Sequence, residues 1–228
     1  MIITIDGPTK SGKSTVARLV AERLAYYYYC SGLLYRACAY ILTTQAGYSA
    51  KTLEDADSED IATYCNMYRL VYHYDLNHGP RILFDNVDIT EHLQKPRIAE
   101  YASMLGANEY MRKEIDIIQE HIIQNHMNVV ADGRDMGSSS FPQAAYKFFL
   151  TASLEERAKR WVQDEEARGN TLSFEDASSY IMARDQRDTI RPHAPLVVPV
   201  DATTIDSTDM KIDEVVDVMV QKVHPKNA

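Results

Sequence analysis

Three observations predict an α/β fold in which helices cover a central parallel sheet. Short apolar segments alternate along the chain with longer segments whose apolar residues recur at helical spacing. The short segments at residues 2–5, 129–132 and 148–150 are largely apolar, as expected of strands that are buried on both faces. A glycine-containing loop, Gly7 to Gly12, joins the first of them directly to a helical segment. This alternation is typical of parallel strands joined by helical crossovers.

The first half of the chain contains strand and helix patterns in turn. Residues 2–5 predict a buried strand, and residues 13–24 a helix whose apolar side chains lie on one stripe. Residues 25–30 include four consecutive tyrosines, which favour a strand; we expect these rings to pack, although a stacking platform for bases is an alternative. The next elements are a helix over 31–44, a helix over 55–67, a hairpin of 70–74 and 82–84, a short element from 88, and two helices within 98–126.

The second half carries clear helix boundaries. Ser153 and Glu156 have the spacing of a capping box, which predicts a helix that runs toward Gly169. Ser173 begins another helix, which Pro192 must stop. Strands are expected over residues 129–132, 148–150 and 204–206, and an amphipathic helix over 212–223. The residues after this last helix are expected to fray.

Composition and charge exclude several classes of protein. The 228 residues are 45% hydrophobic and 25% charged, as in ordinary globular proteins. The net charge of −9 argues against nucleic-acid or anionic-membrane partners, and no 18-residue apolar run predicts a membrane span. Three cysteines without C-x-x-C spacing predict buried thiols rather than a disulfide or a metal site. Because a strand is expected to begin at Ile2, we expect no signal peptide and a cytoplasmic protein.

The loop between the first strand and the first helix carries the clearest chemical signal. Gly7, Gly12, Lys13 and Ser14 have the spacing G-x-x-x-x-G-K-[ST], which cradles the phosphates of a nucleoside triphosphate. Glycine lets backbone amides approach phosphate oxygens, and the helix N-terminus directs its positive dipole end toward them. Lys13 can reach the β- and γ-phosphates, and the Ser14 hydroxyl can ligate Mg²⁺. The strand and helix around the loop disfavour the alternative, a glycine turn without a ligand.

Charged residues outside this loop indicate the type of reaction. Although the chain is acidic, arginines stand at expected loops and helix ends: Arg36, Arg112, Arg134, Arg184, Arg187 and Arg191. Guanidinium groups suit transfer between two phosphorylated molecules, because its transition state needs dispersed positive charge. Arg184, Asp188 and Arg191 fall on one helical face, but a solvated face of ion pairs would have the same pattern. Asp132 ends an apolar strand, where an acid near Mg²⁺ is favoured over an acidic turn residue.

These motifs resemble those of bacterial-type cytidylate kinases, a family of nucleoside-monophosphate kinases. The matching segments follow the family's order from residue 2 to about 216, and the most specific are D-G-R-D-M-G at 132–137 and R-D-x-R-D-x-x-R at 184–191. The other segments are Ile5–Thr15, Ser31-Gly32 with Tyr35-Arg36, Ala102-Ser103, Met111-Arg112, Phe141-Pro142, Phe149–Ser153 with Glu156-Arg157, and Ala194–Leu196.

The resemblance implies transfer of the γ-phosphoryl group of ATP to CMP or dCMP, with Mg²⁺, in pyrimidine nucleotide metabolism. The implied ATP-binding residues are Gly7, Pro8, Thr9, Lys10, Ser11, Gly12, Lys13, Ser14, Thr15 and Arg157. Ser31, Arg36, Arg134 and Arg191 would hold the CMP phosphate, Asp188 the ribose, Ser103, Arg112 and Asp135 the cytosine edge, and Arg184 would lie near the transferring group. Catalysis would then rest on Lys13, Arg134, Arg184 and Arg191, and metal binding on Ser14 and Asp132.

The same resemblance implies a three-layer P-loop fold. One kinase domain over residues 1–228 would have a core (1–37, 96–153 and 192–228), a nucleoside-monophosphate-binding insertion (about 38–95) and a helical lid (about 154–191). Nothing in the sequence indicates an obligate interface, so we expect a monomer. Three residues depart from the family pattern: Lys10 replaces glycine or alanine, Cys30 replaces aspartate, and Leu33 replaces a small residue.

Two other functions would use the same phosphate loop. A GTP-binding switch would need an N-K-x-D motif to read the base, and the sequence lacks one. A kinase for another small acceptor, such as UMP or shikimate, would keep the fold and change only the acceptor pocket.

Overall fold

The computed structural model describes residues 1–224 and divides into two compact units. The first unit consists of Met1–Tyr26 and the chain from Val130 onward, and the second consists of Tyr27–Val129. The chain therefore leaves the first unit after its first helix and returns to it within a strand. The expected frayed end falls mainly on residues 225–228, which lie outside the described part.

The larger sheet confirms the expected α/β architecture. Its strands are β1 (Ile2–Asp6), β2 (Tyr27–Cys30), β6 (Val129–Gly133), β7 (Tyr146–Thr151) and β8 (Thr203–Asp206). Their order is β2-β6-β1-β7-β8, and both β1–β7 and β7–β8 are parallel pairs. Ile3 lies opposite Tyr146, and Asp6 opposite Phe149. Ile3, Ile5 and Phe148 are fully buried, as the apolar character of these segments predicts.

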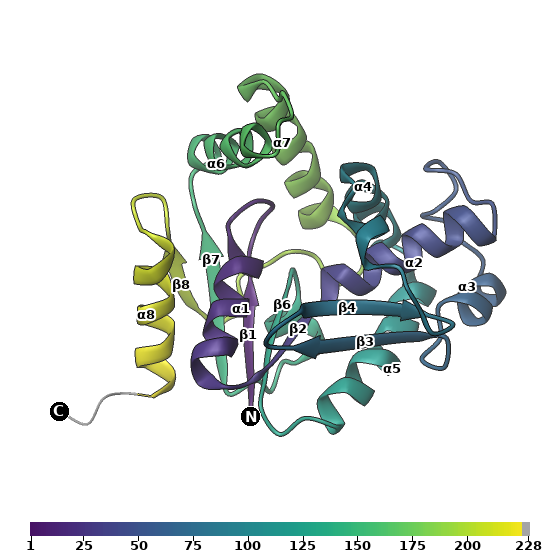
Figure 1. The fold of residues 1–228 in the computed structure, drawn as a ribbon, viewed down its shortest axis with the longest axis horizontal. Helices are drawn as coiled ribbons and strands as arrows, with labels where there is room; N and C mark the ends of the chain where they lie inside the picture. The colour runs from purple at the N-terminus through teal and green to yellow at the C-terminus, as the bar shows by residue number, and fades with distance from the viewer. Residues whose placement is uncertain (225–228) are drawn as a thin grey trace. The chain divides into compact units, whose positions relative to one another are not determined.

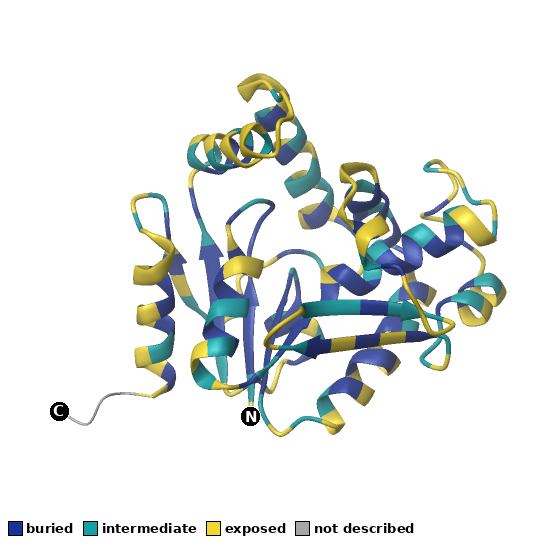
Figure 2. Cartoon of the chain, in the orientation of Figure 1, coloured by how far each residue is buried: buried dark blue, intermediate teal, exposed yellow. Residues whose placement is uncertain are grey.

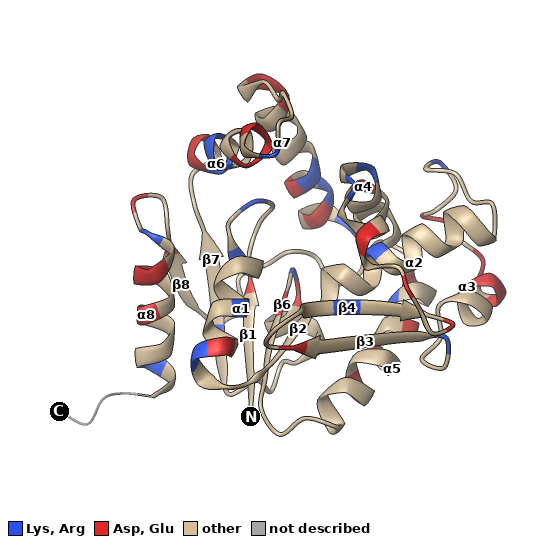
Figure 3. Ribbon diagram, viewed as in Figure 1, with Lys and Arg blue, Asp and Glu red and all other residues tan. Residues whose placement is uncertain are grey.

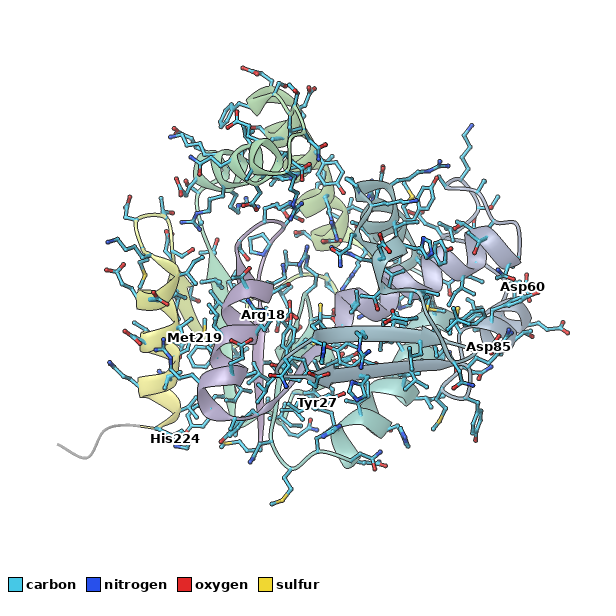
Figure 4. The ribbon with its side chains drawn as sticks, in the orientation of Figure 1. Arg18, Tyr27, Asp60, Asp85, Met219 and His224 are labelled. Atoms are coloured by element: carbon cyan, nitrogen blue, oxygen red, sulfur yellow. The ribbon has the colours of Figure 1, made fainter. Side chains whose placement is uncertain are left out.

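Two helices of the first unit pack side by side. They are α1 (Lys13–Leu24), which begins where the sequence predicts, and the closing helix α8 (Ile212–Val223) (Figure 1). Each buries one apolar stripe, which includes Val16 and Val20 on α1 and Val216 and Met219 on α8. Figure 2 shows the buried stripe of α1 and of α8 as buried residues that alternate with exposed ones along each helix. Met219 of α8 is labelled in Figure 4.

A second helix pair follows β7 and lies beyond the carboxyl ends of β1 and β7 (Figure 1). It consists of α6 (Leu154–Ala167) and α7 (Phe174–Ile190). Both helices begin at the expected serine caps: Ser153 accepts a hydrogen bond from the Glu156 amide, and Ser173 accepts one from the Asp176 amide. The second half of the predicted capping box is replaced, because the Ser153 amide donates to the Thr208 hydroxyl. The pair has a small core of its own, formed by Ala158, Trp161, Ala177 and Ile181.

The second unit is built around helices and a small antiparallel sheet. Its helices are α2 (Ser31–Gln45), α3 (Ser58–Tyr64), the 3-10 helix η1 (Thr90–Gln94), α4 (Pro96–Leu105) and α5 (Glu109–Gln124). The predicted hairpin is present as β3 (Leu70–Asp75) and β4 (Gly79–Phe84), and the two-residue strand β5 (Val87–Asp88) follows it. Helix α3 is shorter than predicted at both ends; it begins at Ser58 because the Asp57 carboxylate caps it and accepts a hydrogen bond from the Glu59 amide.

The tyrosine run and the cysteines confirm the expectation of packing. Tyr28 and Tyr29 are buried, and the ring of Tyr27, labelled in Figure 4, stacks on His126 with 3.5 Å between ring centres. Within residues 1–224 no disulfide joins the three cysteines; Cys38 and Cys65 are buried, and Cys30 is partly exposed. Within residues 1–224, no helix is both long and apolar enough to cross a membrane.

Candidate active site

The loop between β1 and α1 has the backbone that its glycines predict. Gly12 adopts a positive φ of 84° and precedes α1 without a side-chain cap, so the helix N-terminus opens directly onto the loop. Gly7 lies so close to β7 that a Cβ atom there would be 2.1 Å from the carbonyl oxygen of Leu150. Glycine at this position therefore lets the start of the loop lie against the neighbouring strand.

The ammonium group of Lys13 is buried beside this loop. Its Nζ donates a hydrogen bond to the Pro8 carbonyl oxygen over 3.2 Å. Burial is the main cause that lowers the pKa of Lys13, and the charge of Arg134 lowers it further, to about 7. A phosphate group placed here would favour the charged form of the side chain, so the site is suited to an anionic ligand.

Ser14 and Asp132 supply oxygen atoms next to each other. The Ser14 hydroxyl, at the start of α1, donates to Oδ2 of Asp132, at the end of β6, over 2.6 Å. A hydroxyl and a carboxylate are the hard ligands that Mg²⁺ accepts, and Mg²⁺ commonly takes only one or two protein ligands with its remaining positions on water and phosphate. This pair therefore fits Mg²⁺, although residues 1–224 contain no group of three or more His, Cys, Asp or Glu that could hold a metal ion.

Arginines and carboxylates form buried pairs near the loop. Arg134, just after β6, donates through Nε to Oδ2 of Asp188 over 2.8 Å and through Nη2 to the Thr9 hydroxyl over 3.2 Å. Arg191, just after α7, donates to Oδ1 of Asp135 over 2.9 Å. Each arginine has further N–H donors beyond these bonds, which makes a planar, charged contact to a phosphate possible.

The environment of Asp188 shows that the charges converge rather than line a solvated helix face. Its side chain is only 3% exposed. Burial acts to raise the pKa of Asp188, but the charges of Arg134, Arg184 and Arg191 outweigh burial and hold that pKa below its usual value. The charge of Arg184 also acts on Lys13. Figure 3 shows basic and acidic residues together toward the end of α7.

The α6–α7 pair holds the backbone of the phosphate loop at Thr9. Arg157 of α6 donates to the Thr9 carbonyl oxygen over 2.8 Å, and its guanidinium forms a 2.5 Å ion pair with Asp185 of α7. The same Asp185 accepts a hydrogen bond from the Thr9 amide over 2.8 Å. Sequence reasoning assigned Arg157 and Thr9 to ATP but gave Asp185 no role. The only feature of the sequence that could have indicated a role for Asp185 is its place within the R-D-x-R-D motif.

Asp6, at the end of β1, is a second residue that sequence reasoning missed. Its two carboxylate oxygens accept hydrogen bonds from the Met136 amide over 2.8 Å and the Gly137 amide over 2.7 Å. Burial raises the pKa of Asp6 to about 7, although both amide bonds act in the opposite direction. Asp6 thereby fixes the segment that follows Arg134 and Asp135. That segment forms a short π-helical turn, Met136–Ser140, which the sequence did not predict.

The remaining predicted acceptor residues belong to the second unit. Ser31 begins α2 and is buried, Arg36 lies one turn further along α2, and Ser103 is buried on α4. Arg112 of α5 donates to the Tyr35 hydroxyl over 3.2 Å and to the Gly106 carbonyl oxygen over 3.1 Å. All other predicted site residues belong to the first unit, which brings Lys13, Arg134 and Asp188 into one charged cluster.

Comparison with known proteins identifies the family. The family model described as cytidylate kinase matches residues 3–225, nearly the whole chain. The chain belongs to the cytidylate kinase family. The cytidylate kinase of Carboxydothermus hydrogenoformans is 36% identical over 232 residues, which cover 100% of this chain and 99% of that protein. The cytidylate kinase of Enterococcus faecalis is 36% identical over 215 residues, which cover 94% and 91%.

A solved structure shares the fold. An uncharacterised protein from Eubacterium ventriosum matches 99% of both chains with a TM-score of 0.52 and 14% sequence identity. The P-loop kinase fold, the cytidylate kinase family and the phosphotransferase class expected from the sequence are thus confirmed. The roles of individual site residues and the boundaries of core, insertion and lid stay predictions.

Proposed function

We propose that this member of the cytidylate kinase family transfers the γ-phosphoryl group of ATP to CMP or dCMP, forming ADP and CDP or dCDP. The observation that carries the proposal is the charged cluster beside the phosphate loop, in which Lys13, Asp188 and Arg191 are buried and Arg134 and Arg184 are partly buried. A phosphate loop alone would suit many nucleotide-binding proteins. Several guanidinium groups next to it suit a reaction that brings two phosphorylated molecules together.

On the donor side, residues 7–15 would bind the ATP phosphates through the loop amides and the N-terminus of α1. Lys13 would contact the β- and γ-phosphates, and Arg157 would lie over the nucleotide as part of the lid. Ser14 and Asp132 would hold Mg²⁺, which supplies neutralisation of charge on the β- and γ-phosphate oxygens when bound. The 2.6 Å contact between the two side chains supports this assignment.

On the acceptor side, Ser31, Arg36, Arg134 and Arg191 would hold the CMP phosphate, and Asp188 the ribose hydroxyls. Ser103, Arg112 and Asp135 would bind the cytosine edge. A buried polar set of this kind discriminates between bases, because the wrong base leaves donors and acceptors unpaired. The ion pairs of Arg134 with Asp188 and of Arg191 with Asp135 support the proposal, because they fix the two guanidinium groups before a substrate binds.

The reaction would be an in-line displacement without a general base. The attacking oxygen of the CMP phosphate is already ionised near neutral pH, so no side chain has to remove a proton. Lys13 and the arginines would instead neutralise charge as the phosphoryl group moves. The α6–α7 pair, here called the lid, would exclude water and prevent hydrolysis of ATP. We further propose the core, insertion and lid boundaries given above, a monomeric state and a cytoplasmic location.

The proposal is tested by measuring ADP formation from Mg-ATP with one acceptor at a time. The acceptors are CMP, dCMP, UMP, AMP, GMP and shikimate, each at several concentrations. Strong turnover with CMP or dCMP and little with the others is the expected result. Preference for UMP or shikimate would overturn the acceptor assignment, and nucleotide binding without acceptor-dependent turnover would favour a switch.

A further inference from the structure

Lys10 lies at the tip of the phosphate loop in a backbone conformation that favours glycine. Its φ is +60°, in the left-handed region that side chains other than glycine seldom adopt. Its ammonium nitrogen lies 4.5 Å from the centre of the Trp161 ring on α6. This distance is within the range of a cation–π interaction, for which tryptophan is the strongest partner. The strained residue of the loop is therefore also one that contacts the lid.

The indole ring is held firmly within the lid. Trp161 is 7% exposed and belongs to the small core with Ala158, Ala177 and Ile181. Its ring centre lies 4.9 Å from that of Tyr180, and its Nε1 donates to Glu165 over 3.4 Å. Because α6 and α7 both hold this ring, a contact on its face acts on the pair of helices rather than on one loose side chain.

We propose that Lys10 is a positioning residue that holds the lid on the phosphate loop through the face of Trp161. The contact acts beside the hydrogen bonds at the neighbouring Thr9 backbone, whose carbonyl oxygen accepts from Arg157 and whose amide donates to Asp185, and it keeps these groups in place. The inference deepens the proposed function, since it rests on the lid and loop acting together on ATP. It also gives a physical reason for a lysine where glycine would adopt the same backbone without strain.

A direct contact between Lys10 and the ATP phosphates is the alternative role. The two roles differ in what they require of Trp161. If Lys10 acts through the indole ring, a change at residue 10 has no further effect in a variant that already lacks the indole, so the two effects do not add. If Lys10 acts on phosphate, a change at Trp161 leaves the contribution of Lys10 intact, and the two effects add.

The first measurement is hydrogen exchange of the nucleotide-free enzyme. Lys10→Met should speed amide exchange in α6 and α7 roughly 3- to 30-fold, the range that corresponds to a cation–π contact of this kind. Lys10→Arg keeps the cation and should restore slow exchange. Lys159→Met is the control: it removes an exposed lysine of α6 that pairs with Glu155, and it should leave amide exchange in α6 and α7 unchanged. Exchange in α1 and α8 should be unaffected in every variant.

The second measurement uses steady-state kinetics to distinguish action of Lys10 through the lid from direct contact of Lys10 with the ATP phosphates. Lys10→Met should raise the KM for ATP and change the KM for CMP little. Trp161→Leu also removes core packing, so it should raise the KM for ATP at least as much, and adding Lys10→Met to it should cause no further rise. Trp161→Phe keeps an aromatic face, so it covers the case in which the leucine variant does not fold, and its effect should be intermediate. Trp161 is the sole tryptophan of the chain, so its emission should change in Lys10→Met and not in Lys159→Met.

Different results would overturn the positioning role of Lys10 and the proposed kinase function. Additive effects of Lys10→Met and Trp161→Leu on the KM for ATP, or unchanged lid exchange in Lys10→Met, would overturn the positioning role. Absence of CMP-dependent ADP formation in the wild-type enzyme would instead overturn the proposed function. The exchange result is obtained without nucleotide, so these two failures are distinguishable.

Discussion

Two ion pairs of the first unit join parts of the chain that are far apart in sequence. Arg134 is paired with Asp188, and Arg191 with Asp135. Removing one partner of such a pair leaves the other charge buried and uncompensated, which is strongly destabilising. Residues of this cluster therefore support both the fold and the proposed chemistry. Lys13 differs, because its ammonium nitrogen contacts a backbone carbonyl oxygen.

Lys13→Ala should lower CMP-dependent turnover by roughly 10²–10³-fold, as loss of one preorganised electrostatic contact does. Steady-state ADP formation measures the effect. Arg18→Ala is a matched control, because Arg18 lies on the same helix, pairs with Glu22 at the surface and is labelled in Figure 4. Near-normal turnover of the Lys13 variant would contradict the proposed mechanism.

Asp6 should make stability depend on pH. Because burial raises its pKa from 3.8 to about 7, the folded protein retains a proton on Asp6 in a pH range where the unfolded chain has released it. Its contribution to stability is therefore complete below about pH 4 and is lost as the pH rises through 7. The shift corresponds to roughly 4 kcal/mol.

The test of this prediction compares wild type with Asp6→Asn by urea unfolding between pH 4 and pH 8. The free energy of unfolding of wild type, relative to the variant, should fall as the pH rises from 4 to 7 and then level off. A difference between the two proteins that stays constant over this range would show that Asp6 is ionised throughout.

At the scale of elements, the phosphate loop depends on two glycines for different reasons. Gly7 is required by the closeness of Leu150 on β7, whereas Gly12 has open space around its Cβ position and is required only by its backbone angle. A steric conflict with backbone atoms is harder to relieve than an unfavourable φ. The two positions therefore differ in their tolerance of a methyl group.

Gly12→Ala should destabilise the protein by about 1–2 kcal/mol, the cost of a left-handed conformation for alanine. Gly7→Ala should cost more, at or above the upper end of the roughly 1–3 kcal/mol that overpacking costs. The midpoints of urea unfolding, measured with both variants in one series, give the order. A Gly12 variant that is the less stable of the two would refute this account of the loop.

Elements with local signals were predictable from the sequence, and contacts between distant segments were not. Helices α6 and α7 begin at serine caps, and α8 shows an unbroken apolar stripe, so their bounds follow from nearby residues. The π-helical turn at 136–140 depends on Asp6, far away in sequence, so no local pattern indicates it. Likewise Lys13 and Ser14 were found from their motif, whereas Asp185 acts through long-range hydrogen bonds.

At the scale of the whole molecule, an acidic protein is proposed to bind two anions. The net charge is −9, yet Lys13, Arg134, Arg184 and Arg191 act together on one region of the first unit. Charges at the surface are screened beyond about 10 Å at 0.1 M salt, so nearby buried cations determine the local potential. Overall charge therefore disfavours an extended polyanion as a partner but not a nucleotide.

CMP should stabilise the protein against heat even without catalysis. At a concentration 100 times its Kd, a ligand that binds only the folded state adds about 2.7 kcal/mol. For a chain of this length that corresponds to a rise in Tm of about 5–10 °C. Differential scanning fluorimetry with CMP, AMP and shikimate at equal concentrations measures it. Equal shifts with AMP and CMP would contradict base discrimination by the acceptor residues.

The strand order has a consequence for how the chain matures during synthesis. β1 is translated first but lies between β6 and β7, which are translated only after residue 128. During synthesis Ile3 and Ile5 therefore remain without their neighbouring strands until β6 and β7 have been made. The continuous stretch Tyr27–Val129 can already collapse before then. The nascent phosphate loop takes its final shape late, when Leu150 and Asp185 have emerged.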